Sequence, residues 1–363
     1  TINPKTVSLS AVKTYDGTTS LSADQVTVAT GVGSETLNAT GTANNANVTI
    51  TGKYFTAATL ADGTGPSAGL AGNYKLPDTL SNSNASVTIN PKTVSLSAVK
   101  TYDGTTSLSA DQVTVATGVG SETLNATGTA NNANVTITGK YFTAATLADG
   151  TGPSAGLAGN YKLPDTLSNS NASVTINPKT VSLSAVKTYD GTTALDNSQV
   201  TIVTGIANQN LTATGVTAND ANVLTSSKFI NSVTLADGQG GAASNYKLPD
   251  TLSNSNASVT INPKTVSLSA VKTYDGTTAL DNSQVTIVTG IANQNLTATG
   301  VTANDANVLT SSKFINSVTL ADGQGGAASN YKLPDTLSNS NASVTINPKT
   351  VSLSAVKTYD GTT

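Results

Sequence analysis

A long tandem repeat constrains this sequence more than any other feature. The string TINPKTVSLSAVKTYDGTT begins at Thr1, Thr88, Thr175, Thr260 and Thr345 of the 363 residues, so successive starts are 87, 87, 85 and 85 residues apart. This period exceeds the roughly 20–45 residues of a solenoid repeat and suits a small independent domain. We therefore expect one folded domain per copy. The fifth copy is cut short, so we also expect the chain to be a piece of a longer array.

The copies fall into two variants. Residues 1–87 (copy 1) and 88–174 (copy 2) are identical and form variant A, whereas residues 175–259 (copy 3) and 260–344 (copy 4) form variant B. Both variants keep the opening string and the later string NYKLPDTLSNSNASV, but the segment between them is largely rewritten. Identical copies point to recent duplication, so their identity does not tell us which residues matter.

Apolar and polar residues alternate in short stretches of each copy. In copy 1 the apolar positions are Val7, Leu9 and Ala11; Val26 and Val28; Leu37 and Ala39; Val48 and Ile50; and Val87 and Ile89. A period of two predicts strands with one buried face, and no segment keeps a helical period. The sequence therefore predicts an all-β chain, a tandem array of small antiparallel β-sandwich-like domains in an elongated rod. Val, Leu, Ile and Ala are expected to supply most of each core.

The apolar positions change parity at each repeat junction. They are odd at Val87 and Ile89 but even at Val94 and Leu96, whereas one continuous strand would keep its parity. Proline cannot donate a hydrogen bond to a central ladder, so the break is expected at the junction proline. The predicted domains are 4–90 and 91–177 (variant A) and 178–262 and 263–347 (variant B), with 1–3 ending a preceding repeat and 348–363 starting a truncated fifth. The junction prolines are Pro4, Pro91, Pro178, Pro263 and Pro348.

The missing amino-acid types exclude most catalytic chemistry. Cys, His and Arg are absent, which removes thiol nucleophiles, the commonest general base and the bidentate fork for phosphates. A carboxylate pair acting on glycosides is the surviving alternative, but tandem copies with few aromatic side chains are unlike an active-site domain. We therefore expect no enzyme. A formal net charge of −3 disfavours nucleic acid, and no apolar run is long enough for membrane insertion.

Three motifs in each copy resemble a known family. Lys13-Thr14-Tyr15-Asp16-Gly17-Thr18-Thr19, Asn73-Tyr74-Lys75-Leu76 and Val87-Thr88-Ile89-Asn90-Pro91-Lys92 are similar to the YDG/MBG-type repeats of large bacterial surface adhesins, of the filamentous-haemagglutinin-like, two-partner-secretion type. The family pattern has ITPK at the junction and Gly-Asn-Tyr in the second motif, where variant B has Ser244-Asn245-Tyr246. The resemblance covers essentially the whole chain. It implies an extracellular β-rich stalk on the bacterial cell surface, without a catalytic residue.

The Tyr-Asp-Gly motif is interpreted as a structural turn. Glycine permits a positive φ, aspartate bonds to nearby backbone, and tyrosine covers the edge of the core. A ligand contact is the alternative. For Tyr74 we expect a packed ring whose hydroxyl bonds to the backbone, with sugar stacking as the alternative. The turn residues are Tyr15, Asp16, Gly17, Tyr102, Asp103, Gly104, Tyr189, Asp190, Gly191, Tyr274, Asp275 and Gly276.

Calcium is the one metal ion for which the sequence offers candidate ligands. Asp16, Asp24, Asp62 and Asp78 would have to converge in space to bind it. A calcium site needs about six to eight oxygens, usually from clustered acids, and the sequence has no such cluster. We therefore expect no cofactor.

Two functions suit such an array. In the first, the repeats are a structural stalk that projects an adhesive tip for cell–cell or biofilm-matrix attachment. In the second, the repeats themselves bind, because repetition supplies avidity for exopolysaccharide or for neighbouring copies of the same adhesin. We expect the stalk, and homotypic contact is the favoured form of the second function.

Overall fold

The protein is described by a computed structural model that covers residues 1–362. It forms two compact units, Thr1–Lys179 and Thr180–Thr363, and each unit holds two repeat copies. All regular elements in the described part of the chain are strands or three-residue 3-10 helices, so the predicted all-β class and tandem organisation are confirmed. The boundaries proposed above for single copies stay predictions.

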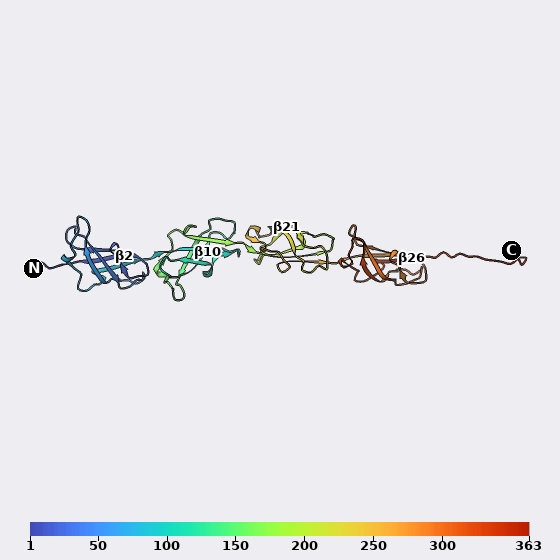
Figure 1. Ribbon diagram of the computed structural model, residues 1–363, viewed down its shortest axis with the longest axis horizontal. Coiled ribbons are helices and arrows are strands. Elements are labelled where there is room, and N and C mark those ends of the chain that lie inside the picture. The colour runs from blue at the N-terminus through green and yellow to red at the C-terminus, as the bar shows by residue number, and fades with distance from the viewer. Residues whose placement is uncertain (363) are drawn as a thin grey trace. The chain divides into compact units, whose positions relative to one another are not determined.

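The last strand of each copy runs three residues past the sequence repeat, so from here on copies 1 to 4 mean residues 4–90, 91–177, 178–262 and 263–347. The first unit contains copies 1 and 2, coloured from blue to green in Figure 1. The elements of copy 1 are β1 (Lys5–Thr6), β2 (Ser8–Thr14), β3 (Ser20–Leu21), η1 (Ala23–Gln25), β4 (Val26–Ala29), β5 (Leu37–Ala43), β6 (Phe55–Asp62), η2 (Ala71–Asn73), β7 (Tyr74–Lys75) and β8 (Ala85–Asn90). The elements of copy 2 are β9 (Lys92–Thr93), β10 (Ser95–Thr101), β11 (Ser107–Leu108), η3 (Ala110–Gln112), β12 (Val113–Ala116), β13 (Asn125–Ala130), β14 (Phe142–Ala148), η4 (Ala158–Asn160), β15 (Tyr161–Lys162) and β16 (Ala172–Asn177).

The second unit contains copies 3 and 4 and repeats the same element order. The elements of copy 3 are β17 (Lys179–Thr180), β18 (Ser182–Thr188), β19 (Ala194–Leu195), η5 (Asn197–Gln199), β20 (Val200–Val203), β21 (Leu211–Ala218), β22 (Ile230–Asp237), η6 (Ala243–Asn245), β23 (Tyr246–Lys247) and β24 (Ala257–Asn262). The elements of copy 4 are β25 (Lys264–Thr265), β26 (Ser267–Thr273), β27 (Ala279–Leu280), η7 (Asn282–Gln284), β28 (Val285–Val288), β29 (Leu296–Ala303), β30 (Ile315–Asp322), η8 (Ala328–Asn330), β31 (Tyr331–Lys332) and β32 (Ala342–Asn347).

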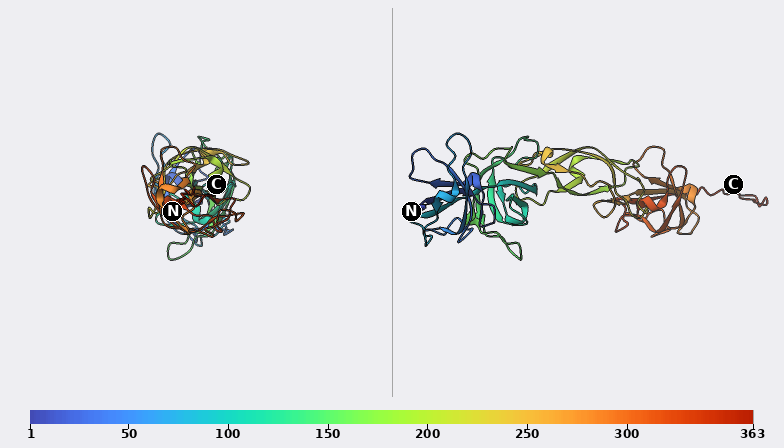
Figure 2. Two further views of the ribbon diagram at one scale, coloured as in Figure 1. Left: turned by 90° about the vertical axis from the view of Figure 1, so that its right-hand side faces the viewer. Right: turned by 60° about the vertical axis from the view of Figure 1, so that its left-hand side comes forward.

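Each copy builds two three-stranded sheets and one two-stranded sheet. In copy 1 the strand orders are β4-β2-β8, β3-β5-β6 and β1-β7, and the other copies repeat them. The strands of a copy can be followed by colour in Figures 1 and 2. Both large sheets contribute buried side chains to the core of their copy. In copy 1 these include Leu9, Ala11, Val87 and Ile89 from the first sheet and Leu37, Ala39 and Phe55 from the second.

The first sheet of each copy is mixed, which corrects the prediction of antiparallel pairing. In copy 1, β2 pairs antiparallel with β4 but parallel with β8, where Leu9 lies opposite Ala85 and Lys13 opposite Ile89. The chain completes the second sheet before it returns to β2. The last strand therefore arrives by a long crossover, and a crossover allows it to run in the same direction as β2.

The second sheet depends on one close approach. Gly41 lies on β5 beside Phe55, the first residue of β6, whose side chain is fully buried. A Cβ at Gly41 would lie 2.6 Å from the Phe55 ring and 2.5 Å from the Ala57 carbonyl oxygen. Only glycine fits this position, and it allows the aromatic ring to fill the small core.

One predicted strand does not form. Val48 and Ile50 alternate with threonines, but residues 44–53 are a loop and Ile50 is exposed. The ammonium group of Lys53 donates to the carbonyl oxygens of both Val48 and Ile50. The strand prediction was wrong because side chains, rather than a neighbouring strand, form the hydrogen bonds to the backbone of this segment.

Candidate functional site

The Tyr-Asp-Gly turn of copy 1 is held together by a buried lysine. Lys13 continues the inward face of β2, and its Nζ donates to the carbonyl oxygens of Thr18 at 3.1 Å and Ser20 at 2.9 Å. The same ammonium group lies 2.6 Å from Asp16 Oδ1. Asp16 Oδ1 also accepts a hydrogen bond from the Thr18 amide at 2.9 Å. Gly17 has a φ of 79°, which closes the turn.

The turn directs the Tyr15 side chain at copy 2. The Tyr15 hydroxyl donates to Glu122 Oε1 at 2.7 Å, and Tyr161 donates to the other oxygen of Glu122, also at 2.7 Å. The two tyrosine rings meet edge to face, with centroids 5.3 Å apart. Gly17 brings its backbone against Val119, since a Cβ there would lie 3.0 Å from Val119 Cγ1. The tyrosine that the sequence predicts at the edge of a core thus joins two copies.

A second contact joins the 44–53 loop of copy 1 to copy 2. Asn160 Oδ1 accepts a hydrogen bond from the Val48 amide at 2.8 Å, and Asn160 Nδ2 donates to Asn47 Oδ1 at 2.9 Å. Asn160 is only 1% exposed, so both bonds are shielded from water. Because Lys53 binds the carbonyl oxygen of Val48, it also positions this loop for the contact.

Copies 3 and 4 repeat this junction with one chemical change. Tyr189 donates to Gln294 Oε1 at 3.0 Å, and Tyr331 donates to the same oxygen at 2.5 Å. The two rings again meet edge to face, 5.4 Å apart. Asn330 Oδ1 accepts from the Val223 amide at 2.8 Å, as Asn160 does in the first unit. A neutral amide therefore replaces the carboxylate, while the two tyrosines and the asparagine stay.

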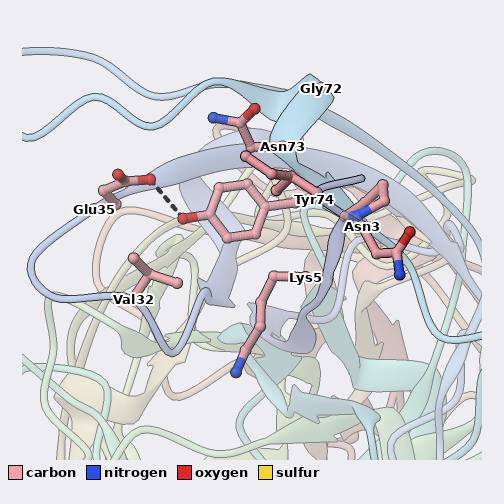
Figure 3. Close-up of a pocket in the computed structure, with 9 residues that line it drawn as sticks. Asn3, Lys5, Val32, Glu35, Gly72, Asn73 and Tyr74 are labelled. Atoms are coloured by element: carbon pink, nitrogen blue, oxygen red, sulfur yellow. Dashed lines mark hydrogen bonds between the residues drawn. The ribbon is translucent and has the colours of Figure 1, made fainter.

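The corresponding surface of copy 1 is open and is shown in Figure 3. We call it the open socket; it is lined by Ile2, Asn3, Pro4, Lys5, Val32, Glu35, Gly72, Asn73 and Tyr74. It encloses a cavity of about 410 Å³. Tyr74 donates to Glu35 Oε2 at 2.5 Å, which matches the bond between Tyr161 and Glu122 in copy 2. Val32 is 40% exposed, whereas its counterpart Val119 is 6% exposed.

The junction changes the ionisation of its tyrosines. Burial, together with the hydrogen bond to Glu122 and the negative charge of that carboxylate, raises the pKa of Tyr15 to about 12. The same causes raise the pKa of Tyr161. In the open socket the hydrogen bond to Glu35 and burial raise the pKa of Tyr74. These tyrosines remain neutral donors throughout the ordinary pH range.

The turn aspartates are held in the charged form. Burial by itself would raise the pKa of Asp16, but the hydrogen bonds from Lys13 and Thr18 outweigh it and hold that pKa below its usual value. In copy 4, the hydrogen bonds that Asp275 accepts from Lys272 and Thr277 lower its pKa to about 2. Each aspartate is therefore a permanent acceptor inside its own turn.

The predicted turn residues occupy equivalent places in all four copies. Gly104, Gly191 and Gly276 have φ values of 81°, 80° and 80°. The threonine amide two residues after the aspartate donates to Asp103, Asp190 and Asp275 at 2.9 Å in each case. Tyr274 differs in being 38% exposed, whereas Tyr15 and Tyr189 are buried.

The junction prolines lie at strand ends. Pro91 is the single residue between β8 and β9, and Pro263 is the single residue between β24 and β25. Pro178 stands between β16 and β17, Pro4 precedes β1, and Pro348 follows β32. Since β8 pairs within copy 1 and β9 pairs with β15 of copy 2, one residue separates the sheets of successive copies in the first unit.

Three residues of the turn and the junction were not predicted from the sequence. Lys13 belongs to the first family motif, but a lysine side chain is normally expected to be exposed. Glu122 and Asn160 contact residues that lie more than a hundred positions away in the sequence. Tyr74 was expected to bond to the backbone, but its partner is the Glu35 carboxylate. The sequence did hold one signal for the junction, the two strings that both variants share. The first string contains Tyr15, and the second contains the Asn-Tyr pair of the socket.

Within residues 1–362, no three acidic side chains come together in a way that could hold a metal ion. The same residues include no helix with the length and apolar character needed to cross a membrane. No protein-family model matches the chain, and neither a curated protein nor a solved structure matches it.

Proposed function

We propose that this chain is a spacer segment of a bacterial cell-surface adhesin. Its repeats form an extracellular stalk that carries an adhesive tip to another cell or to the biofilm matrix. The observation that carries the proposal is the hydrogen bond from Tyr15 to Glu122, since it fixes the turn of one copy in the next copy. A stalk needs such a contact, because domains joined only by a flexible linker do not keep their separation.

Two contacts besides the covalent connection favour a stiff joint. Besides the Tyr15 bond, Asn160 binds the 44–53 loop of copy 1, and only Pro91 separates β8 from β9. Three attachments, one covalent and two non-covalent, restrict the joint more than the short linker would alone. The same arrangement holds in the second unit at Tyr189 and Asn330.

The alternative of exopolysaccharide binding has little platform at these motifs, because among the motif tyrosines of copies 1–4 only Tyr274 is exposed, at 38%. Aromatic rings that stack on sugars must be exposed, but Tyr15, Tyr74 and Tyr189 are each at most 7% exposed. Their hydroxyl groups also already donate to Glu122, Glu35 and Gln294. The geometry therefore favours the spacer.

Small-angle X-ray scattering of the full chain tests this proposal. Four repeats that each add about 30–40 Å would form a rod of about 140 Å, with a radius of gyration of about 40 Å. A compact domain of this length would have a radius of gyration of about 21 Å. Replacing both junction tyrosines (Tyr15→Ala with Tyr189→Ala) should lower the value and broaden the distance distribution.

Tyr359→Ala is the matched control, because Tyr359 is 93% exposed and contacts no junction. It should leave the scattering curve of the chain unchanged. A compact wild-type chain would contradict the proposal, and so would a double variant whose curve superimposes on that of the wild type.

A further inference from the structure

The second sheet of each copy ends in a long edge strand. In copy 1 this strand is β6, which pairs antiparallel with β5 and ends the strand order of its sheet. The equivalent strands β14, β22 and β30 end the same sheet in the other copies. Proteins usually protect such an edge with proline, lysine or a bulge, because its unpaired backbone groups can bond to another strand. Residues 57–61 contain neither proline nor a charged residue, and their register with β5 is regular.

The hydrogen bonds of β5 show which backbone groups of β6 point outwards. The amide of Asn44, just after β5, donates at 3.0 Å to the residue that precedes β6. Every second residue of a strand bonds to the same neighbour, so Thr40 also bonds towards β6. Thr40 lies opposite Thr59, whose backbone groups therefore point at β5. The backbone groups of the residues on either side, Ala58 and Leu60, point away from the sheet.

The edge is exposed in every copy, whichever neighbour that copy has. Copies 1 and 3 are followed by another copy within their unit, and copies 2 and 4 are preceded by one. The threonine at the centre of the edge strand is exposed in all four, so neither kind of neighbour covers the edge. These threonines are Thr59, Thr146, Thr234 and Thr319.

We infer that β6 and its equivalents pair antiparallel with the same edge strand of a second copy of this chain. A two-fold axis at Thr59 places this residue opposite itself and Ala58 opposite Leu60, so that their outward backbone groups exchange hydrogen bonds. The edge fits itself in this register. The facing side chains between 57 and 61 are neutral, and the one nearby charge, Asp62, lies opposite Thr56 rather than another carboxylate.

This contact joins stalks side by side and goes beyond the proposed spacer role. A single pair of short strands forms few hydrogen bonds and must offset the entropy of association, so it is weak. Each chain carries four such edges, and two chains that are held by more than one pair gain avidity. We therefore expect association in solution at high protein concentration.

Sedimentation equilibrium of the full chain tests the inference over about 10 μM to 1 mM, which spans Kd values typical of weak association. The average mass of the wild type should rise above 36.2 kDa with concentration. Lysine at the central edge position would face lysine across each pair, so this edge set should associate at least about tenfold more weakly. The edge set combines Thr59→Lys, Thr146→Lys, Thr234→Lys and Thr319→Lys.

The matched control places the same charges one strand away from the edge. Thr40 lies opposite Thr59 on the central strand β5 and is also exposed, as are its equivalents. The control set has the same net charge as the edge set but keeps the edge neutral, so it should associate like the wild type. The control set combines Thr40→Lys, Thr127→Lys, Thr214→Lys and Thr299→Lys.

A mixture of opposite charges tests the two-fold register. The glutamate version of the edge set should also associate weakly by itself. An equimolar mixture of the lysine and glutamate edge sets should recover at least the wild-type affinity, because lysine then faces glutamate in every pair. The lysine and glutamate control sets should associate equally well alone and mixed. An edge set that associates like the wild type, or a mixture without recovery, would overturn the inference.

Hydrogen exchange of the wild type supplies a readout that does not depend on any variant. The outward amides of Ala58 and Leu60 should exchange more slowly at high concentration, whereas that of Thr59 already bonds to β5 and should not change. A constant wild-type mass, or association without this protection, would overturn the inference even if a variant failed to fold. Scattering at low concentration measures the spacer role separately, so an extended but monomeric chain would refute this inference alone.

Discussion

The Tyr15 hydroxyl donates a hydrogen bond to Glu122 Oε1 at 2.7 Å, although the two residues are 107 positions apart in the sequence. Tyr161 of copy 2 donates to the other carboxylate oxygen, so one side chain receives a tyrosine from each of two copies. In the second unit one amide oxygen of Gln294 receives both tyrosines. The joint therefore requires an oxygen acceptor at this position rather than a negative charge.

Substitutions of Glu122 should separate these two requirements. Glu122→Gln recreates the chemistry of Gln294 and should lower the free energy of unfolding of the chain by less than about 1 kcal/mol. Glu122→Leu leaves two buried hydroxyl groups without an acceptor and should lower it by about 2–3 kcal/mol. Urea unfolding followed by circular dichroism measures both effects.

The same substitution in copy 1 is the control for this comparison. Glu35 binds only the hydroxyl of Tyr74 in its own copy, so Glu35→Leu should cost about half as much as Glu122→Leu. Equal losses for Glu35→Leu and Glu122→Leu would show that the bond from Tyr15 contributes nothing.

Alkaline pH should weaken the junction of the first unit. The pKa of Tyr15 is about 12 in the folded protein, against an ordinary value of 10.0. A raised folded-state pKa means that the folded protein holds the phenolic proton more tightly than the unfolded chain. The resulting stabilisation is fully present below pH about 10 and is lost as the pH rises towards about 12.

Urea midpoints measured across that range check this prediction. Tyr15→Phe removes the titrating hydroxyl, so the variant should be less stable than the wild type at neutral pH, and the gap should shrink between pH about 10 and 12. A gap that stays constant over this range would contradict the assignment of the alkaline loss to Tyr15.

The period-two patterns predicted much of the fold but not the long connections. Leu9 and Ala11 face inward as expected, and the same inward face continues through Lys13. The alternation at Val48 and Ile50 is as regular, but these residues form a loop because Lys53 binds their carbonyl oxygens. Alternation shows which side chains share a face of an extended segment, and cannot show whether another strand is available to pair with it.

The junction was less accessible to sequence reasoning than the strands. Tyr15 was recognised as part of a turn, but its partner Glu122 lies in the segment that differs between the variants. A lysine is rarely buried without partners, and the carbonyl oxygens that satisfy Lys13 come from residues that follow in the same turn. Such pairings depend on where the chain returns in space, which residue spacing alone does not encode.

Removing the lysine of the turn should destabilise every copy. Lys13→Met leaves two carbonyl oxygens and the Asp16 carboxylate without their shared donor, so we expect a loss of about 3 kcal/mol per copy. The change is best made in all copies at once, so that one unfolding transition reports it. The equivalent residues are Lys13, Lys100, Lys187 and Lys272.

An exposed lysine of the same copy supplies the control. Lys75 forms an ion pair with Asp78 at 3.4 Å, but both side chains are largely in water. Lys75→Met and its equivalents should therefore change the stability of each copy by no more than about 0.5 kcal/mol. Similar thermal midpoints for the Lys13 and Lys75 sets would refute a structural role for the buried ammonium group.

Glycine replacements can separate the strain of the turn from the packing of the junction. Gly17 and Gly276 have nearly the same φ, 79° and 80°, so alanine meets the same backbone strain at both positions. Their surroundings differ. A Cβ at Gly17 would lie 3.0 Å from Val119 Cγ1 and 3.3 Å from Glu122 Oε1, whereas a Cβ at Gly276 would lie 4.0 Å from its nearest neighbour, the Tyr274 hydroxyl.

Gly276→Ala should therefore lower the stability of the chain by about 1 kcal/mol, which is the cost of a left-handed backbone for alanine. Gly17→Ala should cost about 1 kcal/mol more, because the new methyl group crowds the next copy and moves the Tyr15 hydroxyl away from its acceptor. Differential scanning calorimetry of the two variants measures the difference. Scattering should also detect a looser chain for Gly17→Ala only, since Gly276 lies outside both filled junctions. Equal melting temperatures and equal scattering would mean that the turn of copy 1 does not press against copy 2.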